Sequence, residues 1–463
     1  MKEFDVVVIG SGPGGYTTAI RASQLGFKTA IIERDRLGGV CLNWGCIPTK
    51  ALLKNAELMN GIKHLDKYGI SAENVKFDFE KIIERSRGVA DMSEKGVKYL
   101  MKKNKIEVFE GSGFINKDKS ITVTDKEGKE IDKIISKHTI IATGAKARSL
   151  GNLKFDEKKV LSSTGAMILK DLPEKMTIVG SGAIGVEFAY FYNAFGTEVT
   201  VIEMMPNIMP VEDKDISDVV AREFKKSGIK ILTDTKTESV EVKGGVVTTK
   251  VSGKTNEDIV SDVVLIAIGV TGNVENLGLE DLGINIDKSS IKVDKDYKTN
   301  VDGIYAIGDV IGPPWLAHVA SSEGINCIEK IKGMHTPDID YNTIPGCTYC
   351  QPQVASVGLT EKKAIEEGYE VNVGKFPFSA NGKSRAIGET AGMVKVIFDK
   401  KYDELIGAHI VGAEATELIM EFVLAKSLEA THEQIIKTVH AHPTLTESNL
   451  EAVGVAYGEA INI

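Results

Sequence analysis

The sequence predicts an α/β protein in which two similar units precede a C-terminal α+β domain. The main observation is a succession of apolar strand, glycine-rich loop, helix and second strand with an acidic end, which occurs twice. A second observation is a change after about residue 337, where strands and helices mix without another glycine-rich loop. The repeats indicate two Rossmann-like dinucleotide-binding domains, and the last segment indicates a separate domain.

The first repeat begins with an apolar strand at residues 4–9, followed by a helix at 16–25 and a strand at 29–32 that ends in Glu33. The loop after the first strand carries Gly10, Gly12, Gly14 and Gly15. Such glycines let the backbone approach a pyrophosphate, the helix N-terminus favours its negative charge, and the carboxylate accepts hydrogen bonds from a ribose diol. A glycine-rich turn without a ligand is the alternative, but the complete succession favours a dinucleotide site.

The second repeat has a strand at 176–179, a helix at 186–195 and a strand at 198–202 that ends in Glu203. Its loop carries Gly180, Gly182, Ile184 and Gly185. A protein that binds two dinucleotides is most simply an enzyme that passes electrons between FAD and a nicotinamide. Because Glu203 repels a 2′-phosphate and no cation occurs in the next three residues, the second repeat is predicted to bind NAD rather than NADP.

The remaining residues complete the two predicted cofactor sites. Residues 63–100 are predicted to be mainly helical, and 106–124 and 133–141 to form strands. A buried strand within 299–310 ends in Asp309, which suits a sugar or ribityl hydroxyl, and the helix that follows could stabilise charge on a reduced flavin. The residues predicted to contact FAD are Gly10, Gly12, Gly14, Gly15, Glu33, Gly113, Thr143, Gly144, Asp309, Ala317 and His318, the last of which equally suits helix capping. Those predicted to contact NAD are Gly180, Gly182, Ile184, Gly185, Glu203 and Gly269.

Two cysteines, Cys41 and Cys46, lie in a glycine-rich stretch after the first repeat. Pro48 suits the first turn of a helix predicted over 49–59, so Cys46 lies near a helix N-terminus, where the macrodipole favours a thiolate. A disulfide between the two would close a short loop and stabilise the fold little, as a reversible redox centre requires. Two packed thiols without redox chemistry are the alternative.

The composition of the 463-residue chain excludes several classes of function. A net charge of −9, without a cluster of basic residues, argues against a nucleic-acid partner. No apolar run is long enough to span a membrane, and the chain leads straight into a strand, so we expect no leader peptide. Five cysteines are too few for a disulfide scaffold. We therefore expect the reducing cytoplasm, where a disulfide is more often catalytic than structural.

The chain is predicted to divide into four segments. Residues 1–147 and 274–340 are predicted to bind FAD, 148–273 to bind NAD, and 341–463 to form an α+β domain that joins two subunits. In this last domain strands are predicted at 353–357, 371–376, 392–399 and 405–411, and helices at 360–367 and 414–428. Subunit association is the expected role because the domain has no nucleotide loop.

Four features of the sequence occur together in a known family. They are the cysteine stretch 39–50, the two glycine-rich repeats, the pair Gly308–Asp309, and His442-Pro443-Thr444 with Glu447. Together they resemble the pyridine nucleotide–disulfide oxidoreductases over essentially the whole chain. The resemblance implies an FAD enzyme that oxidises dihydrolipoyl groups carried by another protein and reduces NAD⁺ to NADH. It also implies a homodimer whose partner is a lipoylated carrier, either the E2 component of a 2-oxo acid dehydrogenase complex or the H protein of glycine cleavage, and no metal.

The resemblance implies a role for each residue around the cysteines. Cys41 is the thiol that meets the substrate, and Cys46 is the thiol beside the flavin. Lys50 lies near the flavin and pairs with Glu187 of the NAD domain. The two thiols of the predicted redox disulfide are therefore expected to be unequal.

The resemblance further implies that His442, held by Glu447 and supplied by the other subunit, is the acid–base. The chemistry needs such a base, because a thiol with a pKa near 8.5 must lose its proton before it attacks a disulfide. His440 is separated from His442 by one residue, and we expect it to have a supporting role rather than a catalytic one.

Other interpretations remain open. A related FAD disulfide reductase, similar to glutathione reductase or mercuric reductase, would have the same fold. A flavin- or NAD-binding redox sensor or docking subunit would use that fold without fast turnover. The C-x-x-C pair of Cys347 and Cys350 can be redox-active or supply half of a zinc site. No second ligand pair lies nearby, so we predict packed or exposed thiols instead.

Overall fold

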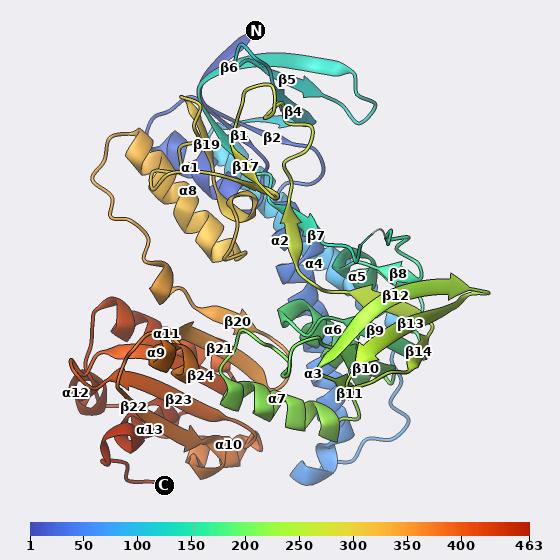
Figure 1. Ribbon diagram of the computed structural model, residues 1–463, viewed down its shortest axis with the longest axis vertical. Coiled ribbons are helices and arrows are strands. Elements are labelled where there is room, and N and C mark those ends of the chain that lie inside the picture. Colours follow the sequence, from blue (N-terminus) through green and yellow to red (C-terminus); the bar gives the residue numbers. More distant parts are fainter. Residues whose placement is uncertain (152) are drawn as a thin grey trace. The chain divides into compact units, whose positions relative to one another are not determined.

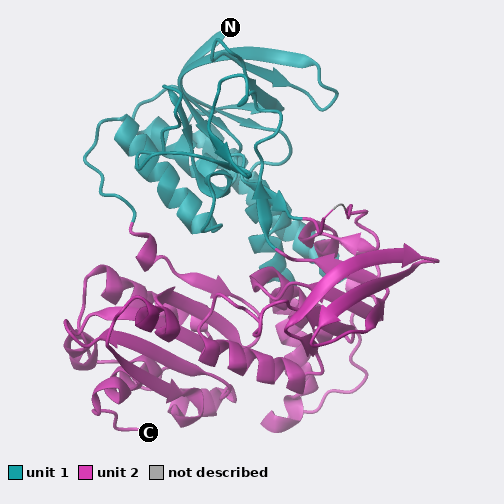
Figure 2. Ribbon diagram, in the orientation of Figure 1, with its two compact units in different colours: residues 1–52, 80–148, 269–339 teal, residues 53–79, 149–268, 340–463 magenta. Residues whose placement is uncertain are grey.

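The structure is a computed structural model that describes residues 1–151 and 153–463, and its chain forms two compact units (Figures 1 and 2). Unit 1 consists of 1–52, 80–148 and 269–339, and unit 2 of 53–79, 149–268 and 340–463. The four-segment division therefore stays a prediction. Within the described residues, no helix combines the length and the apolar character that a membrane crossing requires.

Unit 1 contains one sheet of seven strands in the order β3-β2-β1-β6-β5-β4, with β19 paired to the C-terminal part of β6. The strands β1, β2, β3, β6 and β19 are parallel, whereas β4 and β5 run antiparallel to their neighbours. The seven are β1 (Lys2–Ile9), β2 (Thr29–Glu33), β3 (Glu107–Glu110), β4 (Ser112–Ile115), β5 (Ile121–Thr124), β6 (Glu130–Ile141) and β19 (Ile304–Ala306). Two short ladders are added, β7 (Ala145–Ala147) with β16 (Val270–Gly272) and β17 (Ile286–Asp287) with β18 (Ser290–Ile291).

Helices α1 (Pro13–Gln24) and α8 (Ala317–Ile331) lie side by side in unit 1 (Figure 1). Glycines permit this close approach, because a Cβ at Gly14 would lie 3.0 Å from the backbone oxygen of Ala320 and a Cβ at Gly324 would collide with Thr18. The turn η2 (Gly308–Ile311) precedes α8. The further helices near the start of the chain are α2 (Gly39–Trp44), α3 (Cys46–Lys63), η1 (Leu65–Tyr68) and α4 (Phe79–Lys103).

Unit 2 contains a parallel sheet in the order β11-β10-β9-β15-β8 and a three-stranded antiparallel sheet, β12-β13-β14. Helix α6 follows β9, and its residues are almost all buried, which explains why its sequence is apolar on every face. The strands are β8 (Val160–Leu161), β9 (Lys175–Val179), β10 (Glu198–Ile202), β11 (Lys230–Leu232), β12 (Thr235–Lys243), β13 (Val246–Gly253), β14 (Asp258–Ser261) and β15 (Val263–Ile266). The helices are α5 (Ser163–Met167), α6 (Ala183–Ala194) and α7 (Lys214–Lys226).

The C-terminal part of unit 2 is an antiparallel sheet in the order β20-β21-β24-β23-β22, with helices packed against it. The strands are β20 (Gly346–Thr348), β21 (Gln353–Gly358), β22 (Val371–Pro377), β23 (Met393–Asp399) and β24 (Leu405–Gly412). The helical segments are η3 (Tyr341–Thr343), α9 (Glu361–Glu366), η4 (Phe378–Ala380), α10 (Gly382–Ile387), α11 (Ala415–Ser427), α12 (His432–Lys437) and α13 (Glu447–Tyr457).

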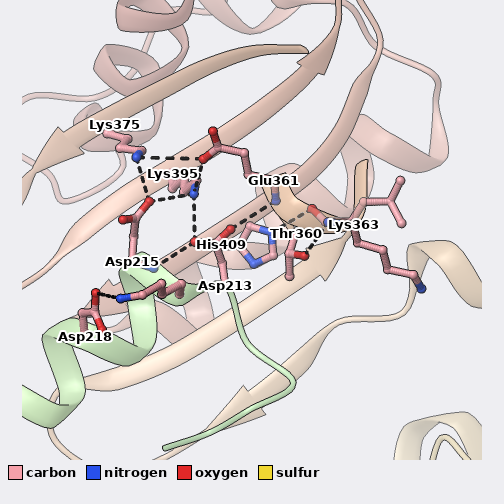
Figure 3. A network of polar contacts seen from close by, with 11 residues as sticks. Asp213, Asp215, Asp218, Thr360, Glu361, Lys363, Lys375, Lys395 and His409 are labelled. Carbon is pink, nitrogen blue, oxygen red and sulfur yellow. Dashed lines mark hydrogen bonds and ion pairs between the residues drawn. The ribbon is translucent and has the colours of Figure 1, made fainter. Parts of the chain in front are cut away.

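A buried lysine joins the start of α7 to this C-terminal sheet (Figure 3). The Nζ of Lys395 lies 2.8 Å from Asp213, 2.7 Å from Asp215 and 2.7 Å from Glu361, and its side chain is only 2% exposed. Burial alone would raise the pKa of Asp213, but the hydrogen bond and charge of Lys395 hold that pKa below its ordinary value. Because each buried charge is paired, the cluster ties the two halves of unit 2 together.

The cysteine stretch contains a short helix, α2, where the sequence indicated only a glycine-rich loop. Gly38 and Gly39 adopt φ angles of 100° and 60°, which turn the chain tightly into α2. The buried amide of Asn43 donates hydrogen bonds of 3.0 Å to the carbonyl oxygens of Leu37 and Gly39. These bonds hold the Asn43 side chain against the start of α2 and the residues just before it.

Two helix boundaries also differ from the prediction. Helix α3 begins at Cys46 rather than at residue 49, so Pro48 is its third residue. Its missing N–H is harmless there, because the first N–H groups of a helix have no helical partner. Residues 69–78 interrupt the segment predicted as helical over 63–100, and the interruption begins where Gly69 adopts a φ of 70°.

Candidate redox and nucleotide sites

Cys41 and Cys46 lie on either side of the break between α2 and α3. Both are thiols, with Cys41 half-buried and Cys46 exposed. The Cys41 thiol is hydrogen-bonded to the sulfur of Cys46, and this bond, together with burial, raises the pKa of Cys41. Since Cys46 is the first residue of an 18-residue helix, the helix N-terminus favours negative charge on its sulfur. The arrangement keeps the proton on Cys41.

Side chains that the sequence analysis missed fix the turn between the two cysteines. The Nη1 of Arg87, on α4, donates to the carbonyl oxygen of Asn43 at 2.7 Å, and its guanidinium lies 4.9 Å from the centre of the Trp44 ring. The Trp44 Nε1 in turn donates to Asp35 at 2.9 Å. A cation therefore holds the C-terminal end of α2, whose carbonyl groups lack helical partners. No local motif marks Arg87, because it is 44 positions from Asn43.

The first glycine-rich loop leaves room for a ligand at the start of α1. A Cβ at Gly10 or Gly15 would collide with backbone oxygens, whereas nothing lies within 4 Å of a Cβ placed at Gly12, the N-cap of α1. The helix N-terminus thus opens onto free space, as a pyrophosphate site requires. At the end of β2, Glu33 accepts hydrogen bonds from the N–H and hydroxyl of Ser11, at 2.9 and 2.6 Å.

The second loop repeats this geometry at the start of α6. A Cβ at Gly180 or Gly185 would again collide with backbone oxygens, and nothing lies within 4 Å of one at Gly182. Glu203 accepts hydrogen bonds from the N–H and hydroxyl of Ser181, at 3.0 and 2.7 Å. The two sites share their internal geometry, and each lies within one unit.

Asp309 lies in a carboxylate-rich part of unit 1, just before α8. Burial, with a smaller effect of Glu323, raises the pKa of Asp309 to about 6. The carboxylate of Glu323 accepts a hydrogen bond of 2.7 Å from the N–H of Gly308. Ala317 is the first residue of α8 and His318 the second. Hydroxyl groups of a ligand would satisfy such a half-buried carboxylate.

Asn273, which the sequence analysis missed, is hydrogen-bonded to the residues that follow β6. Its side-chain amide donates to the carbonyl oxygen of Thr143 at 2.9 Å, its N–H donates to that of Gly144 at 2.9 Å, and its own carbonyl accepts from the Thr143 hydroxyl at 2.8 Å. The two predicted FAD contacts in this exit, Thr143 and Gly144, are thereby held in place.

The structure places the three remaining residues that were predicted to contact a cofactor in three different surroundings. Gly113 lies on β4, where a Cβ would lie 3.2 Å from Ile32, so packing on the sheet explains this glycine. Ile184 is exposed at the start of α6. Gly269 belongs to unit 1, whereas the other predicted NAD contacts belong to unit 2.

Lys50 and Glu187 belong to different units. Lys50 is half-buried on α3, and Glu187 is buried on α6, where it accepts a hydrogen bond of 2.9 Å from the N–H of Tyr349.

The C-x-x-C pair, Cys347 and Cys350, lies on either side of Tyr349. The sulfur of Cys350 is buried and lies 3.3 Å from the carbonyl oxygen of Pro352. Across 1–151 and 153–463, no group of three His, Cys, Asp or Glu side chains is arranged to hold a metal ion.

His442 and Glu447 form a hydrogen-bonded pair in unit 2. The Nδ1 of His442 donates to one carboxylate oxygen of Glu447 at 2.9 Å, and the other oxygen accepts from the N–H of Thr444 at 2.9 Å. Burial alone would raise the pKa of Glu447, but the Thr444 N–H and the His442 ring hold that pKa below its ordinary value. With Nδ1 on the carboxylate and 77% of its side chain exposed, His442 presents Nε2 as a proton acceptor.

Comparison with known proteins agrees with these features. Residues 4–324 match the family described as pyridine nucleotide-disulphide oxidoreductase, and residues 344–453 match the dimerisation domain of that family. The chain therefore belongs to the pyridine nucleotide-disulphide oxidoreductases. The predicted fold class and the resemblance read from the motifs are both confirmed.

Similar proteins carry one recurrent name. The dihydrolipoyl dehydrogenase of Rhizobium etli is 49% identical over 100% of this chain and 99% of that protein. That of Corynebacterium glutamicum is 46% identical, with the same coverage. Among solved structures, LpdA from Mycobacterium tuberculosis has a TM-score of 0.90 at 25% identity, covering 98% of this chain and 99% of that one. The HOCl-induced flavoprotein disulfide reductase RclA from Escherichia coli has a TM-score of 0.86 at 27% identity, covering 97% and 99%.

Proposed function

We propose that the chain catalyses the reaction named in its relatives, the oxidation of a protein-bound dihydrolipoyl group to lipoyl with reduction of NAD⁺. The observation that carries this proposal is the pairing of two unlike thiols at a helix start with a carboxylate-held histidine in the same chain. Relatives that share this name match the chain over essentially its full length at 42–49% identity.

The residues of each nucleotide loop fit the dinucleotides that the family uses. In unit 1, the open N-terminus of α1 at Gly12 suits the pyrophosphate of FAD, and Glu33 and Asp309 suit its hydroxyl groups. In unit 2, Gly182 and Glu203 suit NAD in the same way. When bound, FAD supplies the two-electron exchange between a thiol pair and a nicotinamide.

The two cysteines exchange disulfides with the substrate. In the oxidised enzyme they are joined, and a substrate thiolate attacks the sulfur of Cys41, which breaks the disulfide and releases Cys46 as a thiolate. The helix start at Cys46 stabilises this leaving group. The second substrate thiol then attacks the mixed disulfide, which releases the cyclic disulfide product and the Cys41 thiol.

His442 is the proposed base of this exchange. Its Nε2 accepts the proton of the substrate thiol, whose pKa of about 8.5 leaves it mostly protonated at neutral pH. Glu447 fixes the ring by its hydrogen bond to Nδ1 and stabilises the imidazolium that forms. Lys50 and Glu187 are part of the proposal with the roles that the family resemblance gives them.

The proposal includes a homodimer, supported by the match to a dimerisation domain, in which His442 and Glu447 serve the site of the other subunit. The substrate is carried by a lipoylated protein, either the E2 component of a 2-oxo acid dehydrogenase complex or the H protein of glycine cleavage. The cytoplasm is the proposed location, on the ground of the low cysteine content.

Steady-state rates with dihydrolipoamide, glutathione, NAD⁺ and NADP⁺ test this function. We expect fast turnover only with dihydrolipoamide and NAD⁺, and we expect His442→Gln to lose most of that turnover while flavin stays bound. Preference for glutathione and NADP⁺ would instead identify another disulfide reductase. Slow turnover with every pair would identify a sensor or docking subunit, and normal turnover by His442→Gln would remove this residue from the mechanism.

A further inference from the structure

Both ring nitrogens of His440 face hydrogen-bond acceptors. The Nδ1 lies 2.8 Å from the carbonyl oxygen of Thr438, and the Nε2 lies 2.8 Å from a carboxylate oxygen of Glu421. A carbonyl and a carboxylate can only accept, whereas a neutral imidazole has a single N–H to donate. Both contacts are therefore satisfied only when His440 is the doubly protonated imidazolium.

Burial makes this charge state important. The His440 side chain is 6% exposed, so water has little access to its ring. Removal of the Nε2 proton would place a lone pair against the carboxylate of Glu421. The hydrogen bond to Glu421 accordingly raises the pKa of His440, against the opposing effect of burial.

The imidazolium belongs to a chain of hydrogen bonds that brackets His442. The second carboxylate oxygen of Glu421, on α11, accepts from the amide of Asn449 at 2.8 Å. Asn449 lies on α13, two residues after Glu447, the partner of His442. The segment that carries the exposed His442 is therefore tied to α11 and α13 before the histidine.

The same segment is tied again after the histidine. The N–H of Thr444 donates to Glu447 at 2.9 Å, and its carbonyl oxygen accepts from the side chain of Asn381 at 3.1 Å. His442 itself makes one hydrogen bond to the protein through its ring and is otherwise exposed. The orientation of the His442 ring therefore depends on two anchors, the hydrogen bonds of His440 before it and those of Thr444 after it.

We propose that His440 is a positioning residue for the acid–base pair, held as an imidazolium by Glu421 so that the exposed His442 keeps its hydrogen bond to Glu447. The inference rests on the proposed function, because it takes His442 to be the base that meets the substrate thiol. His440 does not itself exchange protons with the substrate, since both of its nitrogens are engaged inside the fold.

A first variant, His440→Ala, removes the hydrogen bonds that anchor the chain before His442. We expect kcat for dihydrolipoamide oxidation to fall about tenfold or more, because a misplacement of about 1 Å can lower a rate about 10²-fold. Transfer from NADH to an artificial electron acceptor that takes electrons from the flavin needs no thiol base, so that rate should stay unchanged. Normal dihydrolipoamide turnover, or an equal loss of both rates, would overturn the inference.

A second variant, Glu421→Gln, removes the charge while keeping the hydrogen bonds. Its amide N–H₂ can donate to a neutral His440 and its oxygen can accept from Asn449. In the wild type the anchor is complete while His440 is protonated and is lost as pH rises through its raised pKa. In the variant the anchor requires the neutral ring and is lost as pH falls. The charged groups that face His440 are Glu421 from α11 and Glu447 from α13.

The ratio of kcat/KM between Glu421→Gln and the wild type should therefore rise with pH, and ionisations common to both proteins cancel in this ratio. A flat ratio would overturn the charge assignment. Glu433→Gln is the matched control, because Glu433 forms an exposed pair with Lys437 on α12, and its ratio should stay near one at every pH. If the wild type itself fails to oxidise dihydrolipoamide, the proposed function fails, whereas an active wild type with a normal His440→Ala variant refutes only this inference.

Discussion

Replacing Lys395 by methionine removes the charge at the centre of the cluster that joins α7 to the C-terminal sheet, while it keeps most of the side-chain volume. The lysine is almost fully buried and contacts three carboxylates within 2.8 Å. The variant leaves Asp213 and its neighbours with an excess of negative charge in a site that water hardly reaches. Breaking a buried ion pair in this way lowers the free energy of unfolding by about 3–5 kcal/mol.

Calorimetry of the whole protein measures this loss. Because unit 2 is larger than 250 residues, for which about 1 kcal/mol shifts the Tm by about 2 °C, we expect the transition that reports unit 2 to fall by roughly 6–10 °C. The matched control is Lys375→Met, which removes a lysine that also lies 2.7 Å from Asp215 but is 43% exposed. Exposed pairs contribute about 0–1 kcal/mol, so the control should shift the transition little.

The pH dependence gives a second test of the same variant. In the wild type the pKa of Asp213 in the folded state lies below its ordinary value, so its contribution to stability is present above the ordinary pKa and is lost as pH falls through the folded pKa. In the variant, burial raises the pKa of Asp213 and only the N–H groups of Asp215 and Glu361 still donate to its carboxylate, so a proton relieves the charge that has lost its lysine. The difference in stability should be largest at neutral pH and shrink on acidification. A difference below about 1 kcal/mol at pH 7, or one that grows toward acid pH, would refute the reasoning.

Three further outcomes are expected. Iodoacetamide should label Cys41 first in the reduced holoprotein but Cys46 first after removal of flavin, because Cys46 is exposed in the protein chain and Cys41 keeps its proton; peptide mass spectrometry would contradict this by finding one order in both. Glu203→Arg should raise the KM for NAD⁺ by about 10–100-fold through loss of a charged hydrogen-bond acceptor, and lower that for NADP⁺; an unchanged ratio in steady-state kinetics would show that Glu203 does not select the cofactor. Arg87→Met should lower the stability of unit 1 by about 1–3 kcal/mol, because the carbonyl of Asn43 loses its donor; thermal melting that matches the wild type would exclude this clamp.

The nucleotide loops were predictable because the strand, glycines, helix and acidic residue that form each of them lie close together in the sequence. Gly10 and Gly15 are required by backbone atoms a few residues away or on the neighbouring strand, and Glu33 ends the strand that follows the same helix. The strand, loop, helix and acidic residue therefore occur within one short stretch and in a fixed order. The second copy could be recognised for the same reason, since Gly180 and Gly185 meet equivalent backbone oxygens.

The turn between the cysteines could be predicted only in part. Its glycines indicated a loop, whereas α2 is a helix of six residues, too short to show a helical period in the sequence. The residues that hold it came from elsewhere, because Arg87 reaches Asn43 from another helix. Residues that are far apart in the sequence and meet only through tertiary packing form no motif that a sequence can show.

The two histidines near the C-terminus show how environment assigns function to identical side chains. Extended geometry places positions two apart on the same face, so spacing alone does not distinguish His440 from His442, and each of them contacts a carboxylate, at 2.8 and 2.9 Å. His440 is enclosed with an acceptor on each nitrogen, so it must hold its proton to stay in place. His442 has one nitrogen engaged and the other exposed, so it can give and take a proton without breaking its support. The difference lies in burial and in Glu421, a residue of α11, and it therefore becomes visible only when the chain is folded.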